Sequence, residues 1–241
     1  KNAKTDRTIE IQPLLNTFVQ LGIGSFMKRR LVAAGINLYD QGINQCRARL
    51  ASLIAGIATL DFSSASDRIA RNLIRDLLPF EWFCLLEDWR CGTVRYKNLR
   101  FETEKFSAMG NGYTFELESV IFYALTWATF RAFDIPFNDS DITIFGDDLI
   151  CPSAGLKPLA QTFEAVGFKL NSSKSFADGP FRESCGGDFL HGVNVRPCYI
   201  KSRLTQAALT KLHNYYYRRG EYEIAASICD QVDGRFKLFG P

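Results

Sequence analysis

The pattern of apolar and polar positions predicts alternating helices and strands along the chain. Apolar residues recur with the helical period over several stretches, each of which predicts a helix: 13–31, 67–78, 81–89, 115–133, 157–166 and 205–219. An almost wholly apolar run over 53–62 predicts a strand that is covered on both faces. Paired extended runs predict hairpins at 93–106, 141–151 and 181–200. This order predicts an α+β fold in which an antiparallel sheet is backed by helices.

Two adjacent acids stand at the turn of the 141–151 hairpin. Asp147 and Asp148 follow Gly146 at the junction of two short apolar runs. Neighbouring strand residues point to opposite faces, so both acids reach one site only through a distorted turn, which Gly146 permits. Asp and Gly are also ordinary residues of hairpin turns, so this motif alone does not establish a catalytic site.

A third carboxylate, Asp61, ends the apolar run over 53–62. A carboxylate at the end of a buried strand is costly unless a positive charge compensates it, and a metal ion is one of few candidates. The alternative is a helix N-cap, for which three nearby serines compete. Asp67 at the start of the next helix either caps that helix or meets a ligand. The predicted antiparallel sheet brings Asp61 beside the Asp147–Asp148 turn.

Composition narrows the class of protein. The chain has 241 residues and a formal net charge of only +3, which argues against a histone-like polycation. Its seven cysteines include no Cys-x-x-Cys pair and only two histidines accompany them, so neither a zinc site nor a disulfide framework is predicted and a reducing cytoplasm is expected. The longest apolar segment, 119–133, is too short and too flanked by charge to span a bilayer. The chain begins with lysine in what looks like mid-motif, so we expect it to be a fragment of a longer protein.

Three carboxylates without suitable histidine or thiolate neighbours favour a hard cation that prefers oxygen ligands, with Mg²⁺ first. Carboxylates from separate strands can hold two ions, which activate an attacking oxygen and stabilise a leaving oxygen. This chemistry suits nucleotidyl transfer, in which a triphosphate needs cations such as Lys1, Lys4 and Arg7. A departing pyrophosphate needs an acid such as Lys174. The basic opening is equally compatible with a solvated terminal face.

A glycine-rich loop precedes the helix over 115–133. Gly110 and Gly112 flank Asn111 in this loop, which can present backbone N–H groups and small polar side chains to a nucleotide. As a plain loop and helix cap it would be unremarkable.

These motifs together resemble one family. Leu-Asp-Phe-Ser-Ser-Ala-Ser-Asp (60–67), Ser-Ala-Met-Gly-Asn-Gly-Tyr-Thr-Phe-Glu-Leu-Glu-Ser (107–119), Phe-Gly-Asp-Asp (145–148) and Gly-Pro-Phe-Arg-Glu-Ser-Cys-Gly (179–186) follow the order and spacing of polymerase palm motifs. They closely resemble the replicase β subunit of the single-stranded RNA bacteriophages, the levivirus type of RNA-dependent RNA polymerase. The opening Lys-Asn-Ala-Lys-Thr-Asp-Arg (1–7) resembles the basic fingers motif of that family.

The resemblance implies a right-hand polymerase fold divided into parts. It implies partial fingers with a nucleotide-entry motif over 1–52 and a palm over 53–180, with a fingers-like insertion around 80–106. A hairpin resembling a primer grip is implied over 181–203, and the start of a thumb over 204–241. With part of the fingers and thumb outside it, this chain alone is expected to form an incomplete and therefore inactive channel.

The resemblance also implies site residues. Asp61, Asp147 and Asp148 match the catalytic metal ligands, joined by the backbone carbonyl of Phe62, and they would hold two Mg²⁺ ions, with Mn²⁺ as a substitute. Lys174 matches the general acid.

Nucleotide contacts are implied at further positions. Lys1, Lys4 and Arg7 match groups that hold the incoming triphosphate. Ser66, Asp67 and Asn111 are candidates for reading the ribose 2′-hydroxyl, which separates RNA from DNA building blocks. Ser107 and Gly110 of the glycine-rich loop complete the expected nucleotide site.

The implied activity is template-directed RNA synthesis that replicates a phage RNA genome in the cytoplasm of the infected bacterial host. Implied partners are the RNA template and product, ribonucleoside triphosphates, the host translation elongation factors Tu and Ts and a small-subunit ribosomal protein, with no membrane.

Two alternatives stay open. One is a reverse transcriptase built on the same palm, although Ser66 and Asp67 stand where a deoxy-selective enzyme would place a bulky aromatic gate. The other is a non-catalytic scaffold that docks host factors. Two departures from common viral polymerases are a one-residue longer interval from Asp61 to Asp67 and Phe145 in place of a tyrosine.

Overall fold

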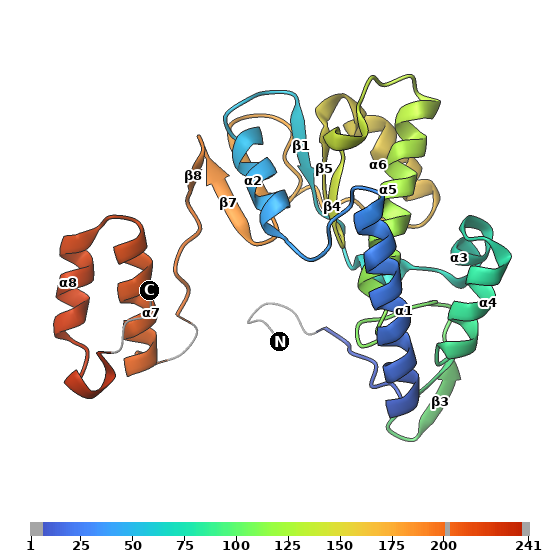
Figure 1. Ribbon diagram of the computed structural model, residues 1–241, viewed down its shortest axis with the longest axis horizontal. Helices are drawn as coiled ribbons and strands as arrows, with labels where there is room; N and C mark the ends of the chain where they lie inside the picture. The colour runs from blue at the N-terminus through green and yellow to red at the C-terminus, as the bar shows by residue number, and fades with distance from the viewer. Residues whose placement is uncertain (1–6, 201–202, 238–241) are drawn as a thin grey trace. The chain divides into compact units, whose positions relative to one another are not determined.

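The computed structural model describes residues 7–200 and 203–237 (Figure 1). Lys1 and Lys4, expected to bind the triphosphate, lie outside the described residues. Within the described ranges the chain forms two compact units, 7–195 and 196–237. Over the same ranges, no helix has the length and apolar character needed to cross a membrane.

A three-stranded antiparallel sheet lies at the centre of the larger unit. Its order is β1 (Ile57–Leu60), β5 (Asp148–Pro152) and β4 (Thr143–Phe145). The register pairs Leu60 with Leu149 and Phe145 with Asp148. The residue after β1 therefore lies beside the β4–β5 turn, which confirms the predicted meeting of Asp61 with the two adjacent acids.

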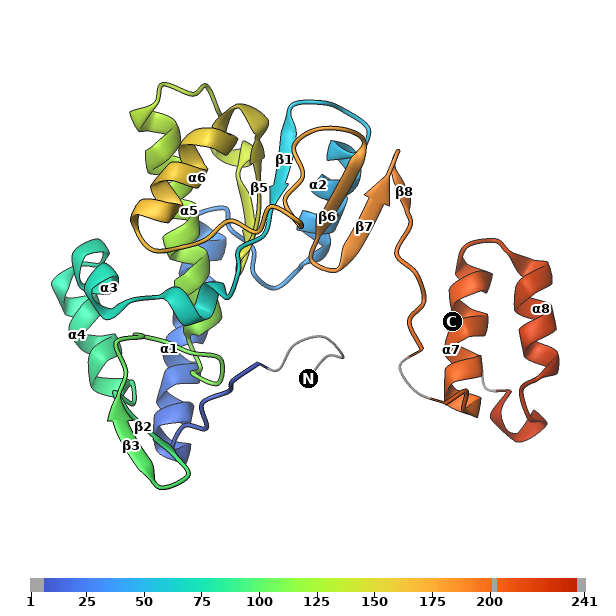
Figure 2. The same cartoon turned by 180° about the vertical axis from the view of Figure 1, so that it is seen from behind.

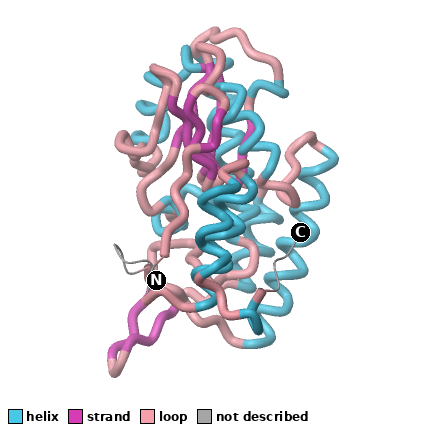
Figure 3. Tube along the Cα trace, turned by 90° about the vertical axis from the view of Figure 1, so that its left-hand side faces the viewer, coloured by secondary structure: helices cyan, strands magenta, loops and turns pink. Residues whose placement is uncertain are grey.

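Helices cover both faces of this sheet (Figures 1 and 2). Alternate residues of β5 point to opposite faces: Leu149 and Cys151 enter the main core, whereas Ile150 packs with Ala48 of α2 (Gly42–Ala51). The main core lies against two predicted helices that the structure confirms, α5 (Thr114–Ala132) and α6 (Leu156–Ala165). Figure 3 shows the strands of the sheet among these helices.

Aromatic rings fill the main core between the sheet and its helices. Phe62 follows β1, and its ring centroid lies 4.7 Å from that of Phe122 on α5 and 4.5 Å from that of Phe163 on α6. Phe168, just after α6, packs edge-on against Phe122 at 4.7 Å. Rings at these separations gain from edge-to-face attraction as well as from burial. The cluster joins β1, α5 and α6 immediately behind Asp61.

Two predicted elements are shorter than the sequence pattern suggests. The strand expected over 53–62 begins only at Ile57, because 53–56 form a turn in which Gly56 has φ +92°. Leu53 and Ile54 are 61% and 48% exposed, so their apolar character does not mark a buried strand.

The helix expected over 67–78 is broken. A short 3₁₀ helix, Ala65–Arg68, is followed by α3 (Arg71–Leu77). Ala70 between them is extended and pairs with Lys105 from the distant insertion, so a tertiary contact interrupts the helical pattern.

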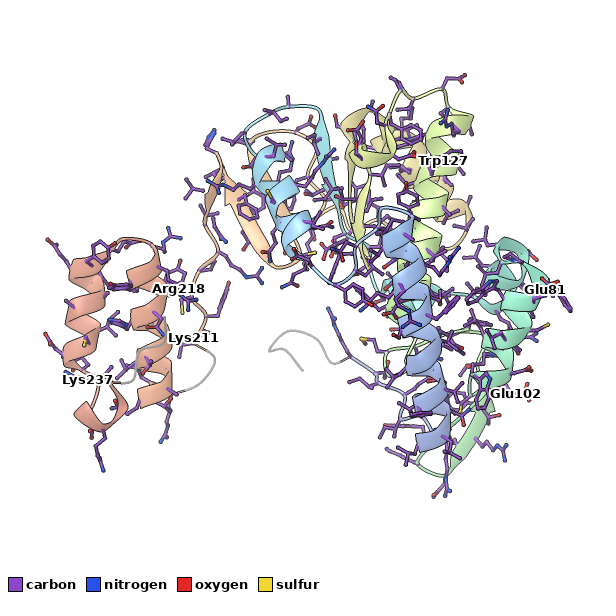
Figure 4. The ribbon with its side chains drawn as sticks, in the orientation of Figure 1. Glu81, Glu102, Trp127, Lys211, Arg218 and Lys237 are labelled. Carbon is purple, nitrogen blue, oxygen red and sulfur yellow. The ribbon has the colours of Figure 1, made fainter. Side chains whose placement is uncertain are left out.

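The helix predicted over 81–89 and the hairpin predicted over 93–106 are confirmed. α4 (Phe80–Trp89) leads into a hairpin of β2 (Thr93–Tyr96) and β3 (Leu99–Glu102), which turns at Lys97 and Asn98. Figure 4 labels Glu81 on α4 and Glu102 on β3.

The glycine-rich segment after α6 forms a second antiparallel sheet. β6 (Phe181–Ser184), β7 (Gly187–Leu190) and β8 (Val193–Asn194) lie in sequence order. Cys185 and Gly186 at the first turn have φ of 48° and 73°, as a type I′ turn requires. The predicted hairpin is confirmed and gains a third strand, and α2 packs against β6 and β7 (Figure 2).

In the described part of the smaller unit, two α-helices, α7 (Gln206–Arg218) and α8 (Tyr222–Asp230), pack against each other. The hydroxyl of Thr205 accepts a hydrogen bond from Ala208 N at 3.3 Å and caps α7. Gly220 links the helices with φ +77°. The helix predicted over 205–219 is confirmed.

The confirmed first helix, α1 (Leu14–Ala33), packs closely on the loop before α5. Gly112 N donates to Gln20 Oε1 at 3.1 Å. A Cβ atom at Gly24 would lie 2.6 Å from the carbonyl oxygen of Gly112, whereas one at Gly22 would meet nothing within 4 Å. Gly24 therefore permits a close backbone approach that holds the loop in place, and Gly22 has no such role.

We expect opposite effects from the same substitution at these two positions. Gly22→Ala raises the free energy of unfolding by about 0.5–1 kcal/mol, because alanine is the better helix former. Gly24→Ala lowers it by roughly 1–3 kcal/mol, because the new methyl group overlaps the Gly112 carbonyl. Urea denaturation of both variants measures the difference. Equal effects of the two changes would contradict the close approach.

Candidate functional site

Three aspartates from adjoining strands form the candidate site. Asp61 is the first residue after β1, Asp147 lies in the β4–β5 turn and Asp148 begins β5. Because β1 and β4 flank β5, the strand order alone brings the three residues to one end of the sheet.

Gly146 shapes the turn that carries Asp147. Its φ of +66° suits glycine at the first position of a two-residue hairpin turn. Its N–H donates to Ser119 Oγ of α5 at 3.0 Å, and a Cβ atom here would lie 2.7 Å from the ring of Phe115. Glycine is thus required for both the backbone conformation and the close approach of α5.

Asp61 is held by the segment that follows α6. Asn171 Nδ2 donates to Asp61 Oδ2 at 2.7 Å, and Asp61 N donates to Ser175 Oγ at 3.1 Å. Lys174 Nζ lies 4.0 Å from Asp61 Oδ1, and its side chain is half exposed. The structure therefore brings the predicted acid Lys174 to the predicted metal ligand Asp61.

Asp148 is held by two elements whose contribution the sequence does not reveal. Asn44 of α2 donates from Nδ2 to the carbonyl oxygen of Asp148 at 3.0 Å, and Ser184 Oγ at the end of β6 donates to Asp148 Oδ1 at 3.3 Å. Helix α2 thus holds the backbone of Asp148, and the second sheet holds its carboxylate.

Burial and mutual repulsion raise the pKa of two of the acids. Burial, followed by repulsion from Asp148 and Asp61, raises the pKa of Asp147 to about 6. Burial also raises the pKa of Asp148, although hydrogen bonding from Cys185 opposes the shift. Crowded carboxylates of this kind gain when a positive charge comes between them.

The donor set fits a hard divalent cation. In the described part of the chain, no group of three or more His, Cys, Asp or Glu side chains is arranged closely enough to hold an ion by itself. Mg²⁺ commonly uses only one or two carboxylates and completes its shell with water and substrate phosphates. The carboxylates and the raised pKa values of Asp147 and Asp148 match that preference. The neighbouring Cys185 thiol is a poor ligand because burial raises its pKa to about 12 and keeps it protonated.

Hydrogen bonds on either side of Phe62 show which way its backbone carbonyl points. Phe62 bridges Leu170, and the flanking hydrogen bonds run from Asn171 N to Asp61 O and from Ser63 N to Lys169 O. The carbonyl of Phe62 therefore points away from the 170 segment.

Arg7 is the predicted triphosphate contact that the structure describes. It is exposed, and its positive charge lowers the pKa of Asp147, against the larger effects of burial and of the other acids. Its field therefore reaches the acidic turn.

The three predicted ribose contacts differ in their burial and in the groups that they contact. Asp67 is ion-paired with Lys105 at 3.1 Å, and Lys105 also reaches Glu10 at 3.1 Å. Ser66 is half-buried and Asn111 is 8% exposed, with its Oδ1 accepting from Tyr113 N at 3.3 Å.

Ser107 and Gly110 have internal roles that the sequence does not indicate. The hydroxyl of Ser107 is buried and hydrogen-bonded to Thr114 Oγ1. Gly110, with φ +108°, lies so close to the carbonyl of Glu10 that a Cβ atom would collide with it. Both residues therefore shape the loop, and Gly110 itself remains exposed.

Glu118 of α5 is a buried acid near the site that sequence reasoning missed. It is 6% exposed, and its Oε1 has no hydrogen-bond partner among the described residues. Burial raises its pKa to about 8, with smaller contributions from the negative charges of Asp147 and Asp67. Its place within the 107–119 motif was a signal, but helical periodicity could not tell which face of α5 it occupies.

We expect Glu118→Gln to change how stability depends on pH. The folded-state pKa of about 8 lies above the ordinary 4.5, so the stabilisation that comes from keeping this acid neutral is full below pH 4.5 and is lost as pH rises through 8. At about 1.4 kcal/mol per pKa unit, the loss is on the order of 5 kcal/mol. Denaturation in EDTA at pH 5 and at pH 8 measures the free energy of unfolding. This free energy should increase in the glutamine variant relative to the wild type as pH rises. Parallel profiles would contradict the burial of an ionisable acid here.

The chain is similar in sequence to a family of known proteins over most of its length. The family model described as RNA replicase, beta-chain, matches residues 1–225. The RNA-directed RNA polymerase subunit beta of Escherichia virus Qbeta is 46% identical over 219 residues, which are 90% of this chain and 37% of that protein. The RNA-directed RNA polymerase beta chain of Escherichia phage MS2 is 46% identical over 204 residues, 83% of this chain and 36% of that protein. The chain thus spans little more than a third of these relatives.

A solved structure shares the fold at much lower identity. The RNA-dependent RNA polymerase of a human picorbirnavirus, in an insertion loop deletion mutant, superposes with a TM-score of 0.65 at 15% identity, covering 98% of this chain and 56% of that one. This agreement confirms the α+β polymerase fold. With the family match over nearly the whole sequence, the chain belongs to the RNA replicase beta-chain family.

Proposed function

We propose that this chain carries the catalytic centre of a polymerase that synthesises RNA on an RNA template. The reaction transfers a nucleotide from a ribonucleoside triphosphate to the 3′ end of the growing RNA. The observation that carries the proposal is the meeting of Asp61, Asp147 and Asp148 at one end of the sheet, with the pKa values of the latter two raised. Family membership over the same residues supports it.

The three aspartates and the carbonyl of Phe62 are the groups that would hold divalent cations. Two Mg²⁺ ions held there, or Mn²⁺ in their place, would supply activation of the attacking 3′-hydroxyl and neutralisation of the charge on the leaving oxygen. The protein keeps the carboxylates in place through Asn171, Ser184 and Asn44. This support limits the reorganisation needed when substrate arrives.

Basic residues act on the phosphates. Arg7, whose charge is felt at Asp147, holds the triphosphate, together with Lys1 and Lys4 at the basic opening. Lys174 gives a proton to the departing pyrophosphate, a role suited to its exposed ammonium group 4.0 Å from Asp61.

Selection for ribonucleotides is assigned to polar residues near the site. Ser66, Asp67 and Asn111 contact the ribose 2′-hydroxyl, which distinguishes this enzyme from a reverse transcriptase on the same palm. The ion pair of Asp67 with Lys105 holds the Asp67 carboxylate in place.

The proposal extends to the biological setting. The product is phage RNA, made in the cytoplasm of the infected host. The proposed partners of the longer protein are the host translation elongation factors Tu and Ts and a small-subunit ribosomal protein.

We expect Asp61→Asn and Asp147→Asn each to reduce Mg²⁺-dependent incorporation of labelled ribonucleotides on an RNA template by on the order of 100-fold or more, because each removes a charge that the transition state needs. The assay uses a full-length replicase that contains this chain. Asp134→Asn is the matched control, because Asp134 has φ +53°, which asparagine tolerates, and lies on the turn after α5. Intact incorporation in both site variants would exclude a catalytic metal site and favour a scaffold.

Lys174→Leu should slow the chemical step while nucleotide binding survives. Loss of a general acid costs roughly 10²–10⁴-fold in rate. Single-turnover incorporation measures that rate, and its dependence on nucleotide concentration reports binding. Lys169→Leu is the control, because Lys169 is an exposed lysine on the same segment. Equal single-turnover rates in the Lys174 variant and the wild type would remove its proposed role.

A further inference from the structure

The segment 170–182 runs along the free edge of β1. Within the described residues β1 is an edge strand, so no strand of the sheet pairs with its outer side. Two isolated antiparallel bridges lie on that side and join Phe62 to Leu170 and Thr59 to Phe176. At the far end Arg182, 1% exposed, donates from Nε to the carbonyl of Ile57 at 2.9 Å. The segment is therefore attached to β1 and to the residue that follows Asp61 at three places, Leu170, Phe176 and Arg182.

Between the two bridges the segment contains extra residues. Residues 171–175 stand opposite only Leu60 and Asp61, so they form a bulge at Asp61. Lys174 N donates to the carbonyl of Asn171 at 3.0 Å and closes a turn within the bulge. The bulge thus carries Lys174 and wraps around Asp61.

Asn171 connects this turn to Asp61 through both its backbone and its side chain. Its N–H donates to the carbonyl of Asp61 at 2.9 Å, and its Nδ2 donates to Asp61 Oδ2 at 2.7 Å. Its Oδ1 accepts from Ser173 Oγ at 2.8 Å, which fixes the orientation of the amide. A flipped amide would set two oxygen atoms against each other at Asp61.

We propose that Asn171 is a positioning residue that fixes the Asp61 carboxylate for cation binding and sets its place relative to Lys174. This inference rests on the proposed function, because it assumes that Asp61 binds the cation. With Oδ2 held by the amide, Oδ1 faces Lys174 at 4.0 Å.

The chemistry of an amide suits this task. A carboxylate that is already oriented loses less rotational freedom when it binds a cation, and groups that orient metal ligands commonly change affinity or activity by about 10–100-fold. An amide donor carries no net charge, so it orients the carboxylate without neutralising the negative charge that attracts the cation. An arginine in the same place would orient the carboxylate and also neutralise its charge.

Binding of Mn²⁺ to the 241-residue chain tests the inference, with free Mn²⁺ measured by electron paramagnetic resonance. Asn171→Leu removes the donor at similar size and should weaken Mn²⁺ affinity by about 10–100-fold. Asn171→Ser removes the amide and leaves a hydroxyl on a shorter side chain that does not reach Asp61 Oδ2. It adds no apolar group and should behave alike. Ser172→Ala, which changes an exposed serine of the same bulge and leaves the Asn171–Asp61 bond intact, is the matched control and should change affinity by less than about threefold. Circular dichroism verifies the folding of each variant. If the leucine variant does not fold, the Mn²⁺ affinity of the serine variant tests the inference.

Activity in a full-length replicase that contains the chain gives a second readout. Raised Mn²⁺ should restore much of the rate lost in the Asn171 variants, because weakened binding is overcome by concentration, whereas a distorted fold is not. Asp61→Asn distinguishes a failure of the positioning role of Asn171 from a failure of the cation site itself. Normal Mn²⁺ affinity in the Asn171 variants with weakened binding in Asp61→Asn would overturn the positioning role alone. Normal affinity in all of them would overturn the cation site as well.

Discussion

The pairing of β1 with β5 is the constraint on which the site depends. Leu60 lies opposite Leu149, so the next residue along β1 and the first residue of β5 stand at the same end of the sheet. Antiparallel pairing requires one register once the inward faces are apolar, because a slip by one residue would turn Leu149 and Cys151 out of the core. The meeting of the aspartates is thus a consequence of hydrophobic burial on a strand that itself carries one of them.

Bringing acids together in this way has an electrostatic cost. Burial and repulsion raise the pKa of Asp147, and Glu118 on α5 adds another buried carboxyl nearby. The surrounding fold holds this arrangement through large contacts that do not involve charge, notably the aromatic cluster of Phe62, Phe122 and Phe163 behind β1. A cation relieves the repulsion, so the same feature that strains the protein without ions favours ion binding.

The supporting groups come from several distant parts of the chain. Asn171 holds Asp61 from the segment after α6, whereas Asn44 and Ser184 hold Asp148 from α2 and β6. Each is a neutral donor, so the carboxylates keep their negative charge. Neutral donors therefore orient the acids without cancelling the negative charge that would attract a cation.

The amino-acid sequence by itself determined the local elements and the acids. Helical periodicity predicted α1, α4, α5, α6 and α7, because an apolar stripe is written into neighbouring residues. Gly146 marked the turn, and its positive φ is a property of that one position.

Tertiary structure decided what touches the acids. Asn171 lies 110 positions from Asp61 and Asn44 lies 104 from Asp148, and such separations leave no periodic trace in the sequence. The same reason explains the broken helix at Ala70, where pairing with Lys105 overrides the local pattern, and the buried face of Glu118. Local sequence encodes conformation, whereas the partners of a buried polar group depend on which distant segments pack against it.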